Sequence, residues 1–465
     1  MSGDAPVLPA AGGPSATAAM SGPLSLGEVL AAADTAFPTL TASRADIEAA
    51  DGERLTAAGG FDPTWKTKAT GVPVSGYPQV RVDSVIEAPT PLWGASFFAG
   101  YRWGGGKFQD YYGSRETWTG GELRAGVSVP LVRNGPIDKR RATLAKAELS
   151  RALAGLSLEQ QRLEVSRLAA VRYWDWVAAG RKREVARALL ALAKDRDAQL
   201  AARTAAGDVA AFDRQDNLRA LVQREALVVQ TQRAVENAAF ELSLFLRDAN
   251  GEPTIPDDAR MPTTLPLPDP ALGEDADVDA ALARRPDVQR LATKRKQLEV
   301  ELSLQKNQLL PGLDVGVAVS KDLGRSPRPE ADALGPAELE VNALLDVPLL
   351  YRAPLGRIQS ARAEVTKVDA QLKLARDRVA VDVRDARSAL HAALARADFA
   401  RREVEVAEQL EQGERSRFAL GDSTQLFVNL REQTTAEARL REVDALADFQ
   451  KAAAALRLAL ASPWQ

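Results

Sequence analysis

The residue types that most often carry out catalysis are scarce in this sequence of 465 residues. Cysteine is absent, which excludes disulfides, thiolate metal sites and cysteine nucleophiles. The single histidine, His391, lies in a stretch with a helical pattern, and a lone histidine is more often an ordinary structural residue than a catalytic base. Gly-rich phosphate loops, His-based metal spacings and nucleophile–base sets are also missing. The sequence therefore predicts no catalytic residues, no metal site and no cofactor.

Among the side chains that remain, carboxylates are the candidates for a functional site. Asp213 and Asp216 are three residues apart in a predicted helix, so their side chains share one face. Such a pair can attract cations, and two ordinary solvated charges fit the same pattern equally well. The 60 Lys and Arg residues nearly balance the 63 Asp and Glu residues. This balance argues against a nucleic-acid-binding protein, which needs a basic excess.

An internal duplication organises the chain, because landmarks of the first half recur in the same order in the second. Pro38 and Pro63 have counterparts 248 positions later, Pro130 has one 218 positions later, and Gly207-Asp208 has one 214 positions later. The first half therefore carries about 30 extra residues between Pro63 and Pro130. We predict a disordered segment at 1–23, repeat 1 at 24–249, a proline-rich linker at 250–276, repeat 2 at 277–462 and a tail at 463–465.

Four segments, two in each repeat, alternate apolar with small or polar residues, which indicates strands. They lie around residues 65–70, 123–131, 313–320 and 341–349, and we expect Val315, Val317, Val347 and Leu349 to face outward. The pattern fits a barrel with a lipid-facing outside and a polar lumen, and it also fits a soluble sheet packed on a helix. Strand-like runs at 80–86 and 95–103 predict an added hairpin or a long loop at one end of the barrel. Four strands cannot close a barrel, so several copies must share one.

Long helices fill most of the remaining sequence. Residues 137–203 and 355–417 contain no proline and are rich in Ala, Leu, Arg, Glu and Val, which favour helix. Return helices are expected at 209–246 and 424–460. Each pair turns at a Gly-Asp, where the glycine suits a left-handed helix end and the following Asp, or Ser423, can cap the next helix. Arg203 and Arg417 precede these glycines by four residues, where a cation suits the negative helix end.

The ordered motifs of the two repeats resemble the TolC-like outer-membrane efflux protein family over residues 24–460. The matching features are the segment 24–30 (LSLGEVL), Arg285-Pro286-Asp287, Leu310-Pro311 before a strand, Val347-Pro348-Leu349 after one, and 417–421 (RFALG). The resemblance implies a mainly α protein with a membrane β-barrel. In this fold a homotrimer shares a 12-stranded β-barrel, with four strands per chain, which continues into a long α-helical coiled-coil barrel.

The resemblance also implies a function. Such a protein is a passive duct in the outer membrane of a Gram-negative bacterium that extends into the periplasm. It serves a tripartite efflux or type I secretion system by docking to a periplasmic adaptor (membrane fusion) protein and an inner-membrane pump. A periplasmic coiled-coil adaptor and a structural scaffold protein are the alternatives, and an enzyme is not expected.

Two groups of site residues follow from the resemblance. The hairpin tips are expected to dock the adaptor through Arg203, Gly207, Arg417, Phe418 and Gly421. The candidate pore gate comprises Asp213 and Asp216 together with Phe427 and Leu430, which occupy positions where such ducts often carry acidic residues. A plain helical hairpin is the simpler interpretation of the tips.

Overall fold

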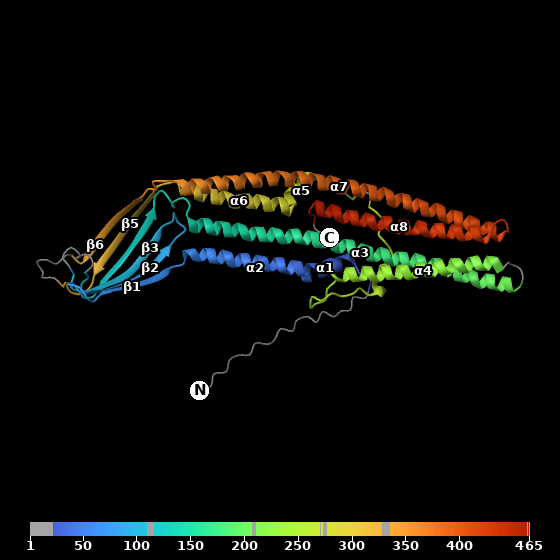
Figure 1. The fold of residues 1–465 in the computed structure, drawn as a ribbon, viewed down its shortest axis with the longest axis horizontal. Coiled ribbons are helices and arrows are strands. Elements are labelled where there is room, and N and C mark those ends of the chain that lie inside the picture. The colour runs from blue at the N-terminus through green and yellow to red at the C-terminus, as the bar shows by residue number, and fades with distance from the viewer. Residues whose placement is uncertain are drawn as a thin grey trace, which may run out of the picture.

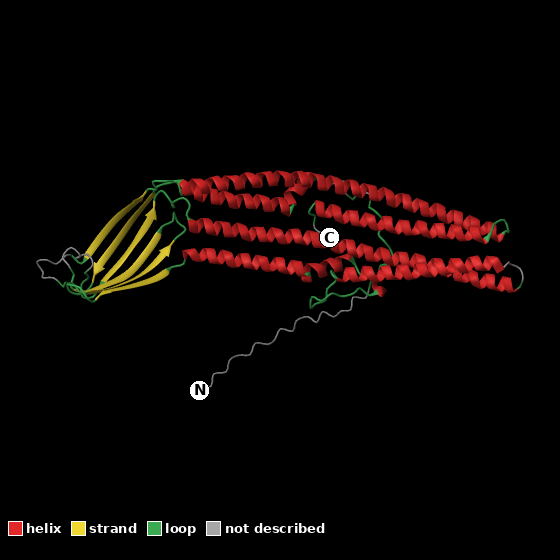
Figure 2. Ribbon diagram, in the orientation of Figure 1, coloured by secondary structure: helices red, strands yellow, loops and turns green. Residues whose placement is uncertain are grey.

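The computed structural model describes residues 22–108, 116–206, 211–269, 271–272, 277–327, 335–462 and 464. The molecule is elongated, with a sheet at one end and long helices that run to the opposite end (Figures 1 and 2). The predicted residue Gly207 lies outside the described residues, as do the segments 1–21, 109–115, 273–276 and 328–334.

Both repeats build the same series of helices, as the duplication predicts. Repeat 1 contains α1 (Leu26–Ala36), α2 (Pro38–Ala58), α3 (Lys139–Ala205) and α4 (Ala211–Ser243), and repeat 2 contains α5 (Val278–Arg284), α6 (Pro286–Asn307), α7 (Arg352–Ala419) and α8 (Gln425–Ala459). Short 3-10 turns lie at Gly59–Phe61 and Asp258–Arg260. Pro38 and Pro286 each occupy the start of a helix, where a missing N–H costs nothing, and they separate α1 from α2 and α5 from α6.

The two longest helices have 67 and 68 residues, so each extends about 100 Å. At the start of α3, Asp138 Oδ1 accepts a hydrogen bond from the Arg141 N–H at 2.9 Å and satisfies one free helix donor. α3 packs antiparallel to α4, α7 packs antiparallel to α8, and α3 also contacts α8. Among the helices within the described residues, none has both the length and the apolar character to span a lipid bilayer.

Six strands form a single antiparallel sheet in the order of the chain. They are β1 (Thr64–Val72), β2 (Gln79–Pro89), β3 (Ser96–Gly106), β4 (Glu122–Pro130), β5 (Gly312–Asp322) and β6 (Ala337–Asp346). The prediction of four strands per chain is therefore wrong in number. The insertion of repeat 1 does form the predicted added hairpin, β2–β3, but its two 11-residue strands lie within the sheet between β1 and β4 and not at one end.

The register divides the sheet into two chemically different faces. Strand partners that lie opposite each other share a face, so Trp65, Ile86, Ala99, Ala125, Val319 and Leu339 form one row across all six strands. We call this side the apolar face. It carries most of the exposed large hydrophobic residues of the strands: Trp65, Val80, Ile86, Phe97, Tyr101, Trp103, Leu123, Val317, Val319, Leu339, Val341 and Leu345.

The opposite side, the polar face, carries charged residues that pair across strands. Arg124 contacts Asp83 at 2.7 Å, and Arg102 Nε donates to Glu122 Oε2 at 2.6 Å. Glu122 is only 5% exposed, whereas Val319 on the apolar face is 54% exposed. A soluble sheet hides its apolar face, and this one exposes it.

The predicted outward residues divide into two groups. Val315 and Val317 lie on the apolar face of β5, as expected. Val347 and Leu349 do not lie in the sheet, because β6 begins at Ala337 and ends at Asp346. Pro348 has no N–H for a ladder hydrogen bond, so the strand pairing stops before it.

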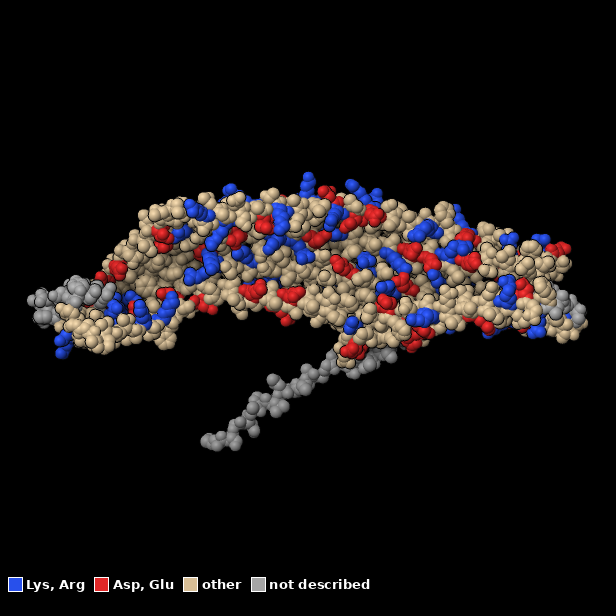
Figure 3. Space-filling model, in the orientation of Figure 1, with Lys and Arg blue, Asp and Glu red and all other residues tan. Residues whose placement is uncertain are grey.

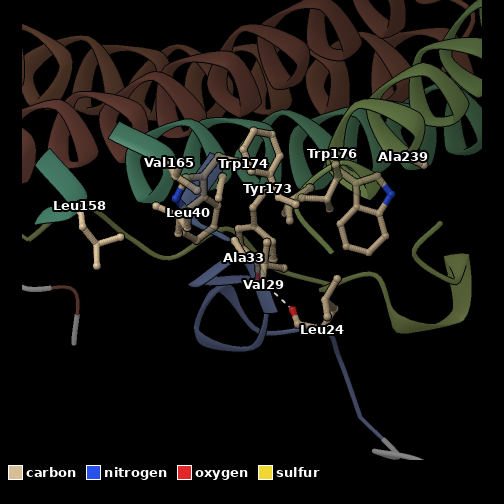
Figure 4. Packing of buried hydrophobic residues seen from close by; sticks show 14 residues of the cluster. Leu24, Val29, Ala33, Leu40, Leu158, Val165, Tyr173, Trp174, Trp176 and Ala239 are labelled. Carbon is tan, nitrogen blue, oxygen red and sulfur yellow. Dashed lines mark hydrogen bonds between the residues drawn. The ribbon is translucent and has the colours of Figure 1, made fainter. Parts of the chain in front are cut away.

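The hydrophobic core lies at mid-length, where α1, α2 and α4 pack on α3. Trp176, Val177 and Leu242 are fully buried there, and Tyr173 Oη donates to the Leu24 carbonyl at 2.9 Å (Figure 4). Burial, followed by the charge of Glu28, raises the pKa of Tyr173 to about 12. Repeat 2 has an equivalent core around Val379. On the surface, charged side chains of both signs are spread along the helical part of the molecule (Figure 3).

Candidate functional site at the helical tips

The turn between α7 and α8 closes the tip of repeat 2. Gly421 has φ +85°, the left-handed conformation predicted for it. Its N–H donates to the Phe418 carbonyl at 3.1 Å, and the Asp422 N–H donates to the Arg417 carbonyl at 2.9 Å. The predicted capping differs from the observed one, because α8 begins after Thr424 without a side-chain cap. Ser423 Oγ instead donates to Glu414, across the turn.

Of the predicted docking residues, those that the structure describes lie at the ends of α3 and α7, opposite the sheet (Figure 1). Arg203 is exposed in the last turn of α3, and Arg417 is exposed in the last turn of α7. Arg417 Nη2 donates to the Asp422 carbonyl at 3.2 Å, so it satisfies a carbonyl of the turn and still faces solvent. Phe418 is half-buried.

The candidate gate residues lie on α4 and α8. Asp216 is 3.3 Å from Arg219, one helical turn further on, and both line a pocket of about 480 Å³ between the two helices. Leu430 lines the same pocket, and Phe427 and Leu430 are both about half exposed. Asp213 lies in α4, but its side chain is outside the described residues. The pocket thus brings Asp216 and Leu430 together.

A buried ionic cluster near the tips was not predicted from the sequence. Glu432 on α8 is 1% exposed and contacts three arginines, each from a different helix: Arg196 of α3, Arg224 of α4 and Arg415 of α7. Arg196 Nη1 lies 2.9 Å from Glu432 Oε2, Arg224 Nη2 lies 3.2 Å from the same oxygen, and Arg415 Nη2 lies 3.0 Å from Oε1. We call these four residues the Glu432 cluster.

Neighbouring polar groups complete the cluster. Arg196 Nη1 also donates to Asn429 Oδ1 at 2.6 Å, Arg224 Nη1 donates to the Leu189 carbonyl at 3.2 Å, and Glu411 pairs with Arg415 at 2.6 Å. Burial disfavours the ionised form of Glu432, but the hydrogen bond from Arg196 and the charges of the three arginines outweigh it, and the pKa of Glu432 is lowered. Burial lowers the pKa of Arg224, and Glu432 partly offsets this effect.

The cluster joins the two helical hairpins by charge. A carboxylate that takes hydrogen bonds from α3, α4 and α7 fixes the position of α8 relative to all three. One sequence signal was available: Glu432 lies four residues after Val428 and three before Thr435, both buried, so a carboxylate occupies the inward stripe of α8. Within the described residues, no group of three or more acidic or histidine side chains is arranged to hold a metal ion.

Part of the chain is similar in sequence to a known protein family. Residues 278–462 match the family described as outer membrane efflux protein. This part of the chain is similar to outer membrane efflux proteins. No curated protein sequence matches the chain.

Solved structures of outer-membrane proteins share its fold. The outer membrane protein VceC of Vibrio cholerae is 17% identical, with a TM-score of 0.64 over 95% of this chain and 97% of that one. The MtrE channel of Neisseria gonorrhoeae, in its open state, is 15% identical, with a TM-score of 0.64 over 94% and 89%. The CmeC channel of Campylobacter jejuni is 13% identical, with a TM-score of 0.63 over 94% and 85%.

The family match covers one repeat of the chain. It spans α5 to α8 with β5 and β6, so it coincides with repeat 2. Repeat 1, which contains the inserted strands β2 and β3, lies outside the family match, whereas the similar structures cover both repeats. The chain therefore shares its fold with these outer-membrane proteins over both repeats, and its own sheet has six strands among the described residues.

Proposed function

We propose that this protein is the outer-membrane channel of a tripartite efflux or type I secretion system in a Gram-negative bacterium. The observation that carries the proposal is the inverted sheet: one face exposes large apolar residues across six strands, and the opposite face carries charged residues, several of which pair across the inner strands. This arrangement suits lipid on one side and a water-filled lumen on the other. The match of residues 278–462 to the outer membrane efflux protein family supports the same conclusion.

The long helices give the channel its periplasmic part. α3 and α7 leave the sheet in the same direction and extend about 100 Å, which is enough to carry the lumen well beyond a bilayer of about 30 Å. The sheet would lie in the outer membrane, and the tips at Arg203 and Gly421 would point into the periplasm. Further copies would complete the duct, because one sheet of six strands has two open edges, and the resemblance to TolC-like proteins implies three copies.

The proposed partners act at the tips. A periplasmic adaptor would dock on the exposed ends of α3 and α7, next to Arg203, Arg417 and Phe418, and would link the duct to an inner-membrane pump. Asp213, Asp216, Phe427 and Leu430 would line the periplasmic mouth. The duct itself catalyses no reaction, and the pump supplies energy and selects the substrate.

A periplasmic adaptor or a structural scaffold, the alternative functions, fits the chain less well. Either protein would be expected to bury the apolar face of its sheet against the rest of the molecule. Here twelve large apolar residues of the apolar face are exposed, and among the described residues no α-helix packs on the sheet.

Planar bilayer recording after membrane fractionation tests the proposal. The full-length protein should separate with the outer membrane, and in detergent it should purify as a trimer that inserts and gives stepwise ionic currents. A monodisperse soluble monomer with native helix content, or a trimer without currents, would refute the channel function. Crosslinkers placed at Arg203 and Arg417 should capture the adaptor, and crosslinkers at the sheet end, at Val80, serve as the control.

A further inference from the structure

The inserted hairpin has the properties of a barrel wall. Each residue of β2 from Gln79 to Pro89 has a partner in β3, and β3 continues the pairing into β4. Ile86 and Phe97 lie on the apolar face, and Arg81 and Arg102 lie on the polar face. A plug or a surface loop would not need to keep the alternation of the neighbouring strands, so β2 and β3 belong to the same wall as β1 and β4.

The two edges of this wall are unprotected. β1 pairs only with β2, β6 pairs only with β5, and every residue of β6 is exposed. Long edge strands with free backbone N–H and C=O groups promote pairing with another chain, and barrel closure removes them. β1 and β6 have 9 and 10 residues, so each can cover the other almost completely.

The charges on the edges are complementary. On the polar face β1 carries Lys66 and Lys68, and β6 carries Glu338 and Glu340. Lys66 pairs with Glu87 of its own chain, whereas Lys68 and Glu340 have no ion pair among the described residues. Opposite charges that face each other across neighbouring strands stabilise the pairing. A second copy of this chain supplies the missing charge for each edge.

One antiparallel register satisfies both faces. If Lys68 of one copy lies opposite Glu340 of the next, Thr70 lies opposite Glu338 on the polar face. On the apolar face, the same register sets Thr67 opposite Val341 and Ala69 opposite Leu339. A slip by one residue would place charged residues among the apolar ones, so the side-chain pattern selects against it.

We propose that β6 of each protomer pairs with β1 of the next, and that three protomers close an eighteen-stranded barrel instead of the twelve-stranded one expected from the sequence. This inference rests on the trimeric channel proposed above and goes beyond it. Because barrel diameter grows roughly linearly with strand number, the outer mouth is about 1.5 times as wide as that of a twelve-stranded barrel.

The hairpin β2–β3 adds two strands to each protomer without adding a helix. β2 and β3 are joined at the helical end by the turn at 90–95, which no helix continues. That turn packs on the loop between β4 and α3: a Cβ on Gly94, which has φ +70°, would lie 2.7 Å from the Asn134 carbonyl oxygen. The hairpin is thus held against the base of the sheet without a helix of its own, and the barrel is wider than the duct beneath it.

Disulfide trapping tests the closure in a chain that has no native cysteine. The double variant Lys68→Cys with Glu340→Cys should give a covalent trimer after mild oxidation, read on non-reducing gels and by native mass spectrometry. Lys68→Cys with Ser320→Cys is the control, because Ser320 lies on the inner strand β5, and it should stay monomeric on the same gel. Covalent species that stop at two copies, or no covalent oligomer, would overturn the proposal.

A second pair of variants tests whether the hairpin lies in the wall. Thr67→Cys with Ser84→Cys joins β1 to β2, where the two hydroxyls are 3.0 Å apart, and Ser96→Cys with Ser128→Cys joins β3 to β4. Both should form disulfides within one protomer of the trimer. Failure of either pair to form would show that the hairpin has left the sheet and that the barrel has fewer strands.

Deletion of residues 79–106 gives the functional measure. β1 ends and β4 begins at the same end of the sheet, so this deletion preserves the direction of the chain. The largest polyethylene glycol that enters from the extracellular side should fall by about one third in diameter. An unchanged size limit would overturn the eighteen-stranded barrel. Stepwise currents in wild type would still support the channel function in that case, so the two proposals fail separately.

Discussion

The two repeats agree in their helices and differ in their strands. α3 and α7 have 67 and 68 residues, and α4 and α8 have 33 and 35, but repeat 1 contributes four strands and repeat 2 contributes two. The helices pack on each other along their length, so a change in one repeat would disturb packing in the other. A hairpin such as β2–β3 returns the chain to the same end of the sheet, so the wall can widen while the helices keep their places.

The tips show a second difference between the repeats. An offset of 214 residues relates the two tips. At this offset the cluster members Arg196, Arg224, Arg415 and Glu432 correspond, in that order, to Leu410, Ala438, Ala201 and Leu218. Each charged residue of the cluster thus has an apolar counterpart in the other repeat. The cluster is a feature of one side of the pseudo-symmetric bundle, and substitutions there should affect the protein more than substitutions at the counterparts.

The largest expected effect is that of Glu432→Leu. The substitution leaves Arg196, Arg224 and Arg415 without their shared carboxylate in a buried site, and it should cost about 3–5 kcal/mol of the free energy of unfolding. Glu408→Leu removes an exposed ion pair with Arg439 on the same helical pair and should cost less than about 1 kcal/mol. Thermal unfolding followed by circular dichroism measures both. Equal losses would show that the cluster contributes no more than a surface pair.

The pH dependence of stability in a second variant at this position, Glu432→Gln, sharpens the comparison. The pKa of Glu432 is lowered in the folded protein, so its stabilisation is fully present above its unfolded value of 4.5 and is lost as the pH falls through the folded pKa. The difference in stability between wild type and Glu432→Gln should be constant near neutral pH and should shrink below 4.5. A difference that grows on acidification would contradict the ionised state of Glu432.

The faces of the sheet predict the next largest effect. Val317 lies on the apolar face between Val127 and Val341, and Val317→Arg should cost about 2–4 kcal/mol at a mid-bilayer position. Ala318 is the matched control, because it lies on the polar face opposite Glu340, where an arginine finds an acidic partner. Ala318 is a cleaner site than Gly316, where an added Cβ would lie 2.3 Å from Asn342 Oδ1. Urea unfolding from vesicles measures both variants, and equal tolerance would refute the two faces.

Much of the fold could be predicted because short stretches of sequence determine it. Pro38 and Pro286 mark helix starts, and the alternation around Val315 and Val317 marks a strand and its outward side. The strand number could not be predicted with confidence in this way. Residues 80–86 and 95–103 already showed strand-like patterns, but whether they join the wall depends on pairing with β1 and β4, which is a contact between distant parts of the chain.

At the candidate site, too, a local feature could be predicted and a feature formed by distant residues could not. The turn at Gly421 follows from one residue and its neighbours, and its left-handed conformation was predicted. A local pattern places Glu432 in the inward stripe of α8, but its partners lie 17, 208 and 236 residues away in the chain, so no local pattern can reveal the cluster that they form. The roles of Arg203, Arg417 and Phe418 in docking, and of Phe427 and Leu430 in the gate, remain predictions.

Gly421→Val should have a smaller effect than a charge on the apolar face. The residue has φ +85°, where a β-branched side chain is strained by about 1–3 kcal/mol, although nothing lies within 4 Å of an added Cβ. The cost is therefore conformational, and adaptor capture at the tip should weaken more than the stability of the trimer. Gly413→Val, within α7 and also without neighbours, is the control for loss of a surface glycine. If both variants bind the adaptor equally, the turn does not position the docking surface.

The smallest effect is expected at the candidate gate. Asp216 pairs with Arg219 at 3.3 Å, so a ring of carboxylates from three copies would be partly neutralised by its own helix. Asp213→Asn combined with Asp216→Asn should leave the free energy of unfolding almost unchanged and should free Arg219. The potential in the mouth would then become more positive, and single-channel recording should show lower cation selectivity and weaker block by multivalent cations. Asp398→Asn, which breaks a similar pair with Arg402 far from the tip, should leave both quantities as in wild type. If the tip variant also matches wild type, Asp213 and Asp216 face the periplasm as ordinary solvated charges, and the constriction must be sought at Phe427 and Leu430.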